Sequence, residues 1–380
     1  INCNDFDIER YCLFEVIPAR YEIKIKTNAN SLSLERLLEI KCPYESIIIK
    51  NSGDISITSL DSTFKFCENL KTIDLSNFDM SGVTSFYSIF YGCKNLSSVN
   101  FGNFMPKQLE NMGAMFSNCK KLISINLSNF DTSKVTYMAH LFFNCTKLVS
   151  LNLSNFDTSK VIDMGFMFYN CYLLTSLNLS NFITSEVTSM SDMIYGCVSL
   201  INLNIETFNV SSVTNMNSIF EKCKNLRYLK INDFQGNNIG GMRNMFYDCF
   251  SLTSIDFNNF IVKRVVHLDN MFFNCHNLKS LDLSNFNTSS AVNMESMFYE
   301  CSSLRYLNIN NFFTNNTISM ENMFLGCRSL ISLNLSNFII SNNTICDNML
   351  FKSSDNLIYC ANDKLYEKIK HQLTDNSCAK

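Results

Sequence analysis

The sequence predicts an α/β repeat protein, a right-handed solenoid in which each 26-residue turn holds one short parallel strand and one short helical or 3₁₀ segment. Three observations predict it: cysteines at one spacing, apolar residues at fixed places between them, and two apolar periods inside each repeat. A period of this length is typical of repeat architectures, and about twelve turns fit the chain. The cysteines that share the spacing are Cys67, Cys93, Cys119, Cys145, Cys171, Cys197, Cys223, Cys249, Cys275, Cys301 and Cys327.

The core positions of each repeat follow the same register. Phe stands three residues before every one of these cysteines except at Ile194, Leu stands three residues after each, and Phe stands eleven residues after each. One repeat cannot bury its own apolar row, so neighbouring turns must stack and share a continuous core. A chain of 380 residues would ordinarily form two or three domains, but a core shared by all turns predicts one solenoid.

The two segments of each turn have different apolar periods. Alternation in SLNLS puts apolar residues on one face and Ser or Asn on the other, which predicts a half-buried strand. The run V-x-x-M-x-x-M-F-x-x-C has apolar spacings of three and four, which predicts the short helical or 3₁₀ segment. A strand that returns to a parallel neighbour crosses over right-handedly.

The repeat register sets the predicted domain boundaries. The solenoid covers 37–350, and residues 1–36 and 351–380 are expected to cap its two ends, because a solenoid needs its end turns shielded from water. The C-terminal cap contains an expected amphipathic helix around 363–373. The chain starts at Ile1 without Met, which fits a mature product after signal-peptide removal and equally a trimmed chain.

Composition and motifs exclude several classes of function. The formal charge is −3 and the 31 basic residues are scattered, so we expect no nucleic-acid partner. No apolar run approaches the ~20 residues of a transmembrane segment. Phosphate-binding loops, G-x-S-x-G, H-E-x-x-H and EF-hand patterns are missing, so the sequence predicts no enzyme, no cofactor and no metal.

The pattern L-x-x-L-x-L-x-x-F, followed by V-x-x-M-x-x-M-F-x-x-C, resembles the 26-residue repeat of BspA-like leucine-rich repeat surface proteins. That repeat is also abundant in mycoplasma lipoproteins and in surface proteins of some parasitic protists. Residues 148–171 (LVSLNLSNFDTSKVIDMGFMFYNC) match closely, and the resemblance covers about 310 of the 380 residues. It implies a leucine-rich-repeat solenoid, secreted or at the cell surface, with an adhesive or host-binding role and no enzymatic activity.

The 17 cysteines fall into two classes. The eleven repeat cysteines are interpreted as a structural core ladder, with each S–H reaching a carbonyl of the adjacent turn; disulfides between rungs and metal binding are weaker alternatives. The other six are disulfide candidates, because small caps benefit from cross-links. Pairing of Cys3 with Cys12, and of Cys360 with Cys378 or Cys346, stays open, as does a spare thiol at each end. These six are Cys3, Cys12, Cys42, Cys346, Cys360 and Cys378.

Asparagines in N-x-S/T sequons are frequent, but repetition of LNLS creates many of them by default. If the chain passes through a eukaryotic secretory pathway, those outside the strands are the better N-glycosylation candidates. These are Asn144, Asn209, Asn315 and Asn342.

Two turns depart from the Ser- and Asn-rich strand face in the same way. Arg227, Tyr228 and Lys230 in one, and Arg305 and Tyr306 in the other, stand where most repeats have small polar residues. Interfaces favour aromatic and Arg anchors, so these five residues are the candidate partner-binding surface. The rest of the polar face could serve solubility alone.

Two classes of function follow. The first is an extracellular or cell-surface interaction or adhesion module that binds a protein or glycan, on another cell or in the matrix, through its solenoid face. The alternative is a structural subunit of an extracellular fibre or coat that self-assembles by end-to-end contacts. A monodisperse monomer would favour the first class and open-ended oligomers the second.

Overall fold

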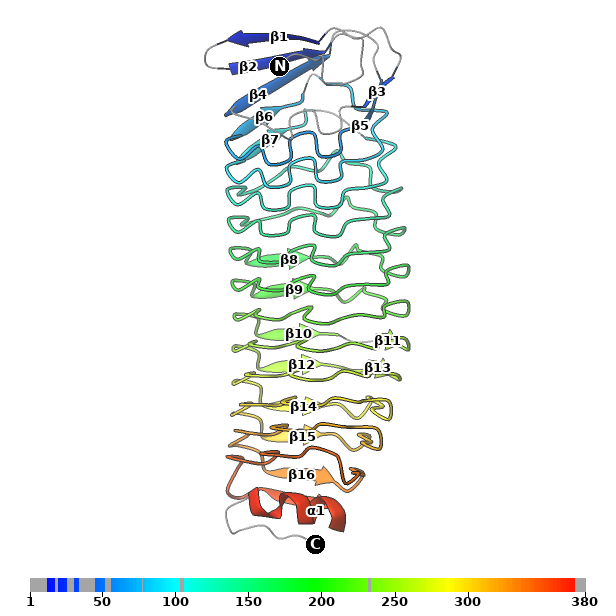
Figure 1. Ribbon diagram of the computed structural model, residues 1–380, viewed down its shortest axis with the longest axis vertical. Coiled ribbons are helices and arrows are strands. Elements are labelled where there is room, and N and C mark those ends of the chain that lie inside the picture. The colour runs from blue at the N-terminus through cyan, green and yellow to red at the C-terminus, as the bar shows by residue number, and fades with distance from the viewer. Residues whose placement is uncertain are drawn as a thin grey trace. The chain divides into compact units, whose positions relative to one another are not determined.

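The computed structural model describes residues 12–17, 20–25, 31–33, 45–51, 56–76, 78–102, 106–231 and 234–372. The chain forms two compact units, Ile1–Leu174 and Thr175–Lys380. Both are β-solenoids of 26-residue turns with parallel strands, about twelve turns in all, as the cysteine spacing predicts (Figure 1).

The first unit contains one five-stranded sheet and a separate strand pair. The sheet order is β1-β2-β4-β6-β7, with β1 antiparallel to β2 and the later pairs parallel. The pair is β3 with β5. Their bounds are β1 Cys12–Ile17, β2 Arg20–Ile25, β3 Ser31–Ser33, β4 Ser46–Asn51, β5 Ser56–Ser59, β6 Thr72–Asp74 and β7 Ser98–Asn100.

The second unit repeats the strand pairing and ends in a helix. Parallel pairs join β8 with β9, β10 with β12, β14 with β15, β16 with β17, and β11 with β13. Their bounds are β8 Ser176–Asn178, β9 Asn202–Asn204, β10 Tyr228–Lys230, β11 Gln235–Gly236, β12 Ser254–Asp256, β13 Ile261–Val262, β14 Ser280–Asp282, β15 Tyr306–Asn308, β16 Ser332–Leu335 and β17 Ile358–Ala361.

Helix α1, Asp363–Ile369, follows β17 and continues into a 3₁₀ turn, Lys370–Gln372. The side chain of Asn362 caps α1 by accepting a hydrogen bond from the amide of Leu365 (3.1 Å). Leu365 and Ile369 are buried, so the helix covers apolar surface with one face. Among the described residues, no helix is both long and apolar enough to span a bilayer.

The Met-Phe run forms consecutive turns in place of the expected helical segment. Some of its backbone amides donate hydrogen bonds to the next turn of the solenoid, and others donate within their own turn. The amide of Phe142 donates to the carbonyl of Met167 in the next turn (2.9 Å), whereas Cys145 donates to Phe142 in its own turn (3.1 Å). Residues five and one before the cysteine have positive φ, as at Phe166 and Asn170 (both 58°). A left-handed residue ends any right-handed helix, so spacings of three and four here mark repeated turns.

Phenylalanines three residues before the cysteine stack through each unit. In the first unit, the ring centroids of Phe90, Phe116 and Phe142 are 5.7 Å apart at each step. In the second, Phe246 lies 5.3 Å from Phe220 and 5.4 Å from the next ring, that of Phe272. All of these rings are fully buried. Stacked aromatic pairs add about 0.5–1.5 kcal/mol each to the burial of their apolar surface.

A column of buried threonines joins neighbouring turns at the far end of the strand. The hydroxyl of Thr132 donates to the carbonyl of Asp157 (2.9 Å) and accepts from its amide (2.8 Å). Thr288 bonds both backbone groups of Phe313 at the same distances. At the equivalent position of β13, Val262 lacks a hydroxyl, and its backbone carbonyl instead accepts a hydrogen bond from the amide of Asn287 in the next turn (2.9 Å).

Candidate binding surface

The outward strand face of the second unit is built by simple alternation. In β10, Leu229 is buried while Tyr228 is exposed and Lys230 is half-buried. In most repeats, the residue at the position of Lys230 is Asn or Asp. Its side chain accepts a hydrogen bond from a backbone amide two residues later, where the strand ends. For example, Asn178 accepts a hydrogen bond from the amide of Ser180 (3.1 Å). Many polar side chains of this face therefore stabilise the turns to which they belong.

The carboxylate of Asp282 is hydrogen-bonded in the same way. It accepts hydrogen bonds from the amide of Ser284 (2.9 Å) and from Asn308. Desolvation raises the pKa of Asp282, but the hydrogen bonds from Ser284 and Asn308 outweigh it, so the pKa lies below its ordinary value.

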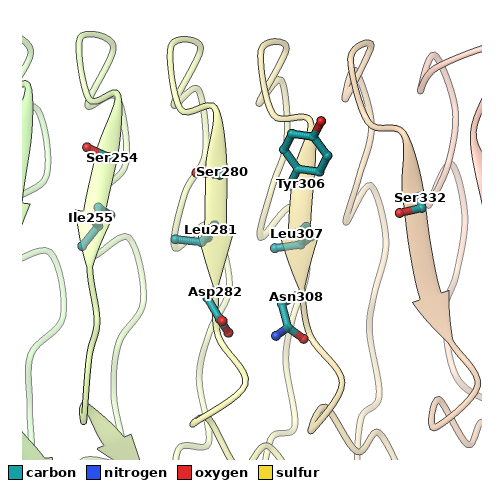
Figure 2. A pocket seen from close by; sticks show the side chains of 9 residues that line it. All are labelled: Ser254, Ile255, Ser280, Leu281, Asp282, Tyr306, Leu307, Asn308 and Ser332. Atoms are coloured by element: carbon teal, nitrogen blue, oxygen red, sulfur yellow. The ribbon is translucent and has the colours of Figure 1, made fainter.

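Two shallow hollows lie on this face, and each contains one of the predicted tyrosines. The hollow on β12, β14, β15 and β16 has a volume of about 400 Å³ and is lined by Ser254, Ser280, Ser332 and Tyr306 among others. Figure 2 shows the ring of Tyr306 rising from β15, with the three serines on the neighbouring strands. The hollow on β8, β9 and β10 has about 500 Å³ and is lined in part by Tyr228.

The five predicted contact residues all lie on the second unit. Tyr228 is 50% and Tyr306 is 62% exposed, so their rings are available to a partner. Arg227 and Arg305 are exposed one position before them. Lys230 differs, because its ammonium group already pairs with Glu206 (3.3 Å).

Sequence reasoning missed Lys279, which is exposed at the position of Arg227 and Arg305, in the repeat directly before that of Arg305. A 26-residue step back from Arg305 would have found it. The serines that line the hollow were also missed, because they follow the repeat consensus and only the structure shows the space between them.

The repeat cysteines form a buried column within each unit. In each observed case, the thiol lies within hydrogen-bond distance of a carbonyl in the preceding turn, 29 residues earlier. The distance from Sγ to that oxygen is 3.1 Å for Cys145 and 3.2 Å for Cys275. Burial raises the pKa of the column thiols, to about 12 at Cys327. Cys67 is also buried but is disulfide-bonded, whereas Cys93 to Cys327 are free.

The candidate cap disulfides are only partly within the described residues. Cys3, Cys42 and Cys378 lie outside them, and only the backbone of Cys12 is described, in β1. Cys346 and Cys360 are free thiols, so Cys360 does not form the predicted disulfide, whereas a free Cys346 agrees with the alternative of a spare thiol at this end. They differ in environment: Cys346 is buried, whereas Cys360 is exposed on β17.

The four candidate glycosylation asparagines have unequal surroundings. Asn144 is half-buried, and its amide bonds Asn118 (3.0 Å) and Asn170 (2.9 Å) on the two adjacent turns. Both ends of this side chain are therefore engaged. The other three side chains are exposed; these are Asn209, Asn315 and Asn342.

The family comparison gives a match over most of the chain. The model described as "Mycoplasma protein of unknown function, DUF285" matches residues 58–176, 173–255 and 242–358. The chain belongs to this family. Membership confirms the mycoplasma part of the predicted resemblance, and the BspA-like name stays a prediction. No curated protein matches the DUF285 chain.

Solved structures similar to the DUF285 chain include two bacterial leucine-rich repeat proteins. The protein from Bacteroides ovatus is 19% identical with a TM-score of 0.47, and 99% of each chain is covered. The protein from Eubacterium ventriosum is 17% identical with a TM-score of 0.44; 88% of this chain and 91% of that chain are covered. A leucine-rich cell surface protein from Faecalibacterium prausnitzii is 15% identical with a TM-score of 0.36, covering 94% and 89%. These likenesses concern the fold.

Proposed function

We propose that the chain is a secreted or cell-surface recognition module that binds a protein or glycan through the strand face of its second unit. One observation carries the proposal: Tyr228 and Tyr306, 50% and 62% exposed, each stand beside a shallow polar hollow at the same strand position. Tyr and Arg dominate the binding energy of many interfaces. Neither ring is part of the core, because at least half of each side chain is exposed.

Two further observations support the proposal. The buried positions repeat from turn to turn, so a departure from the consensus on the exposed face is free to serve recognition. The disulfide at Cys67 supports a location outside the reducing cytosol, where disulfides persist. The proposal assigns the chain no catalytic step, and it treats the residues of the strand face as contacts to a partner.

Binding of the fluorescently labelled chain to cultured animal cells tests the proposal. We expect saturable binding that becomes weaker by about tenfold in the double variant Y228S/Y306S. The matched control is Y87S/Y172S, which removes two tyrosines of 42% and 40% exposure from outside the strand positions. Equal binding by the two double variants, or no saturable binding at all, would refute the proposal.

The alternative role as a fibre subunit has its own observation. Strand β17 pairs with β16 alone among the described strands and carries the exposed thiol of Cys360. Light scattering over a range of concentrations separates the two roles. The recognition module stays a monomer, whereas a fibre subunit forms open-ended oligomers.

A further inference from the structure

A row of cations borders the tyrosines of the second unit. Arg227, Lys279 and Arg305 each stand four residues after their repeat cysteine, and all three are exposed. None of them forms an ion pair in the described part of the chain, in contrast to Lys230, which is paired with Glu206.

Backbone hydrogen bonds fix the spacing of this row. The amide of Thr253 donates to the carbonyl of Arg227 (2.9 Å), and the amide of Lys279 donates to that of Thr253 (3.3 Å). The amide of Arg305 then donates to the carbonyl of Lys279 (2.9 Å). Neighbouring strands lie ~4.8 Å apart, so the three backbone positions are about 10 Å and about 5 Å apart along the sheet.

Two strands of this face, β12 and β14, end in acidic residues. Asp256 and Asp282 are the last residues of β12 and β14, and each carboxylate accepts a hydrogen bond from its own turn. The three cations therefore precede β10, β14 and β15, and the two anions end the middle strands β12 and β14, whereas β10 ends in Lys230 and β15 in Asn308. An extended anionic ligand is attracted to the cations and repelled from the two carboxylates.

The space beside the cations favours sugars over peptide side chains. Ser254, Ser280 and Ser332 contribute hydroxyl groups to the hollow, which offers no deep apolar pocket for an anchoring side chain. Hydroxyl groups hydrogen-bond sugar hydroxyls, and the exposed rings of Tyr228 and Tyr306 can pack against the C–H face of a pyranose. The two tyrosines stand three strands apart, about 14 Å along the sheet, which requires a ligand several sugar units long.

We propose that the second unit binds an acidic polysaccharide, bearing carboxylate or sulfate groups, laid across strands β10, β12, β14 and β15. Its anionic groups lie at Arg227, Lys279 and Arg305, and its sugar rings pack against Tyr228 and Tyr306. This inference rests on the proposed function and names the class of ligand for the same face.

Calorimetry with a heparin dodecasaccharide tests the inference on the full chain. We expect the parent chain to bind heparin and the variant R227Q/K279Q/R305Q to bind it about tenfold more weakly. Each exposed ion pair between a cation and the ligand contributes a modest part of the binding free energy. The matched control K160Q/K263Q/R264Q removes the same charge from exposed positions outside this row and should bind as the parent does. Binding should also weaken as NaCl rises from about 50 mM to about 500 mM, because salt screens exposed charges.

Two further probes identify the class of ligand. Neutral dextran of similar length should not bind measurably, and poly-glutamate should bind at least about tenfold more weakly than heparin, because it lacks pyranose rings for the tyrosines. Absence of heparin binding, equal heparin binding by the two triple variants, or poly-glutamate binding as tight as heparin would overturn the inference. If any of these results is found while binding to cells still depends on the two tyrosines, the recognition role stands. Only the acidic polysaccharide is then excluded as the ligand.

Discussion

The strand faces of the two units differ, although the same repeat builds them. In the first unit, the two residues before the inward-facing strand position are Glu45-Ser46, Lys71-Thr72, Ser97-Ser98, Ile123-Ser124 and Val149-Ser150. None of them is aromatic, and the two charged side chains, Glu45 and Lys71, pair with each other (2.9 Å). In the second unit, the same positions hold Arg227-Tyr228, Lys279-Ser280 and Arg305-Tyr306. Each unit has interior columns of Phe and Cys, with Ile194 in place of one Phe in the second unit. The repeat therefore constrains the interior, and recognition is expected where the exposed positions depart from it.

The largest expected effect tests the claim that the interiors are equivalent. F116A in the first unit and F246A in the second should each lower the free energy of unfolding by about 3–5 kcal/mol, because each removes a fully buried ring from a stack. Urea denaturation followed by circular dichroism measures both. If one variant were nearly as stable as the parent, the two interiors would not be equivalent.

A smaller loss is expected from the threonine column. T132V and T288V keep the side-chain volume but remove the hydroxyl that bonds both the amide and the carbonyl of the next turn. Leaving these backbone groups unpaired should cost about 1–3 kcal/mol in either unit. The same denaturation experiment applies, and V262T serves as a control because that turn already bonds through its backbone. No loss in either valine variant would show that water replaces the hydroxyl.

Asp192 gives the second unit a pH dependence at a position where the first unit has Phe166. Burial, with a smaller contribution from the charge of Glu221, raises the pKa of Asp192 to about 6. The folded state then binds more protons than the unfolded state between about pH 4 and pH 6, so stability falls as pH rises through this window. The partly exposed site limits the effect to about 1 kcal/mol.

The variant D192N should remove this decline and be more stable than the parent at pH 7. Measuring the unfolding midpoints of both proteins at about pH 4, 5, 6 and 7 gives the difference in their pH dependence. Parallel pH curves for the parent and D192N would contradict the assignment.

The smallest effect concerns reactivity and not stability. Cys360 is exposed and free, whereas Cys93 to Cys327 are buried and free. Brief treatment of the native protein with a maleimide should label Cys360 and leave the column thiols unlabelled, because the thiolate is the reactive form and burial raises the column pKa values. Peptide mass spectrometry identifies the labelled site. Labelling of Cys145 under native conditions would show that the column opens.

The sequence predicts the fold well where one repeat position has one physical role. The 26-residue register locates the buried Phe, Leu and Cys columns and the strands such as β10 and β15. It does not distinguish a short helix from consecutive turns, because both place apolar residues three and four apart. The left-handed residues one before the cysteine, such as Asn170, are mostly Gly, Asn or Asp, which tolerate this conformation, and they are a signal that the sequence offers. Those five before the cysteine, such as Phe166, vary in residue type and offer no such signal.

The candidate surface is less predictable than the core. Tyr228 and Tyr306 stand out as departures from consensus, but Ser254 and Ser280 contribute to the hollow while matching the consensus. Their importance comes from the neighbours that a parallel register places beside them. The repeat register places Lys279 at the position of Arg305, and the backbone hydrogen bond from the amide of Arg305 to the carbonyl of Lys279 (2.9 Å) shows that the two are neighbours.

The most direct test gives the second unit the strand face of the first. The variant R227S/Y228S/R305V/Y306S replaces four exposed residues by those found at the same positions in the first unit, and leaves every buried column unchanged. Its binding to cultured cells is compared with that of the parent chain, with urea denaturation as the control for folding. The account predicts an unchanged unfolding midpoint and binding weakened by at least about tenfold. Undiminished binding by the folded variant would contradict it.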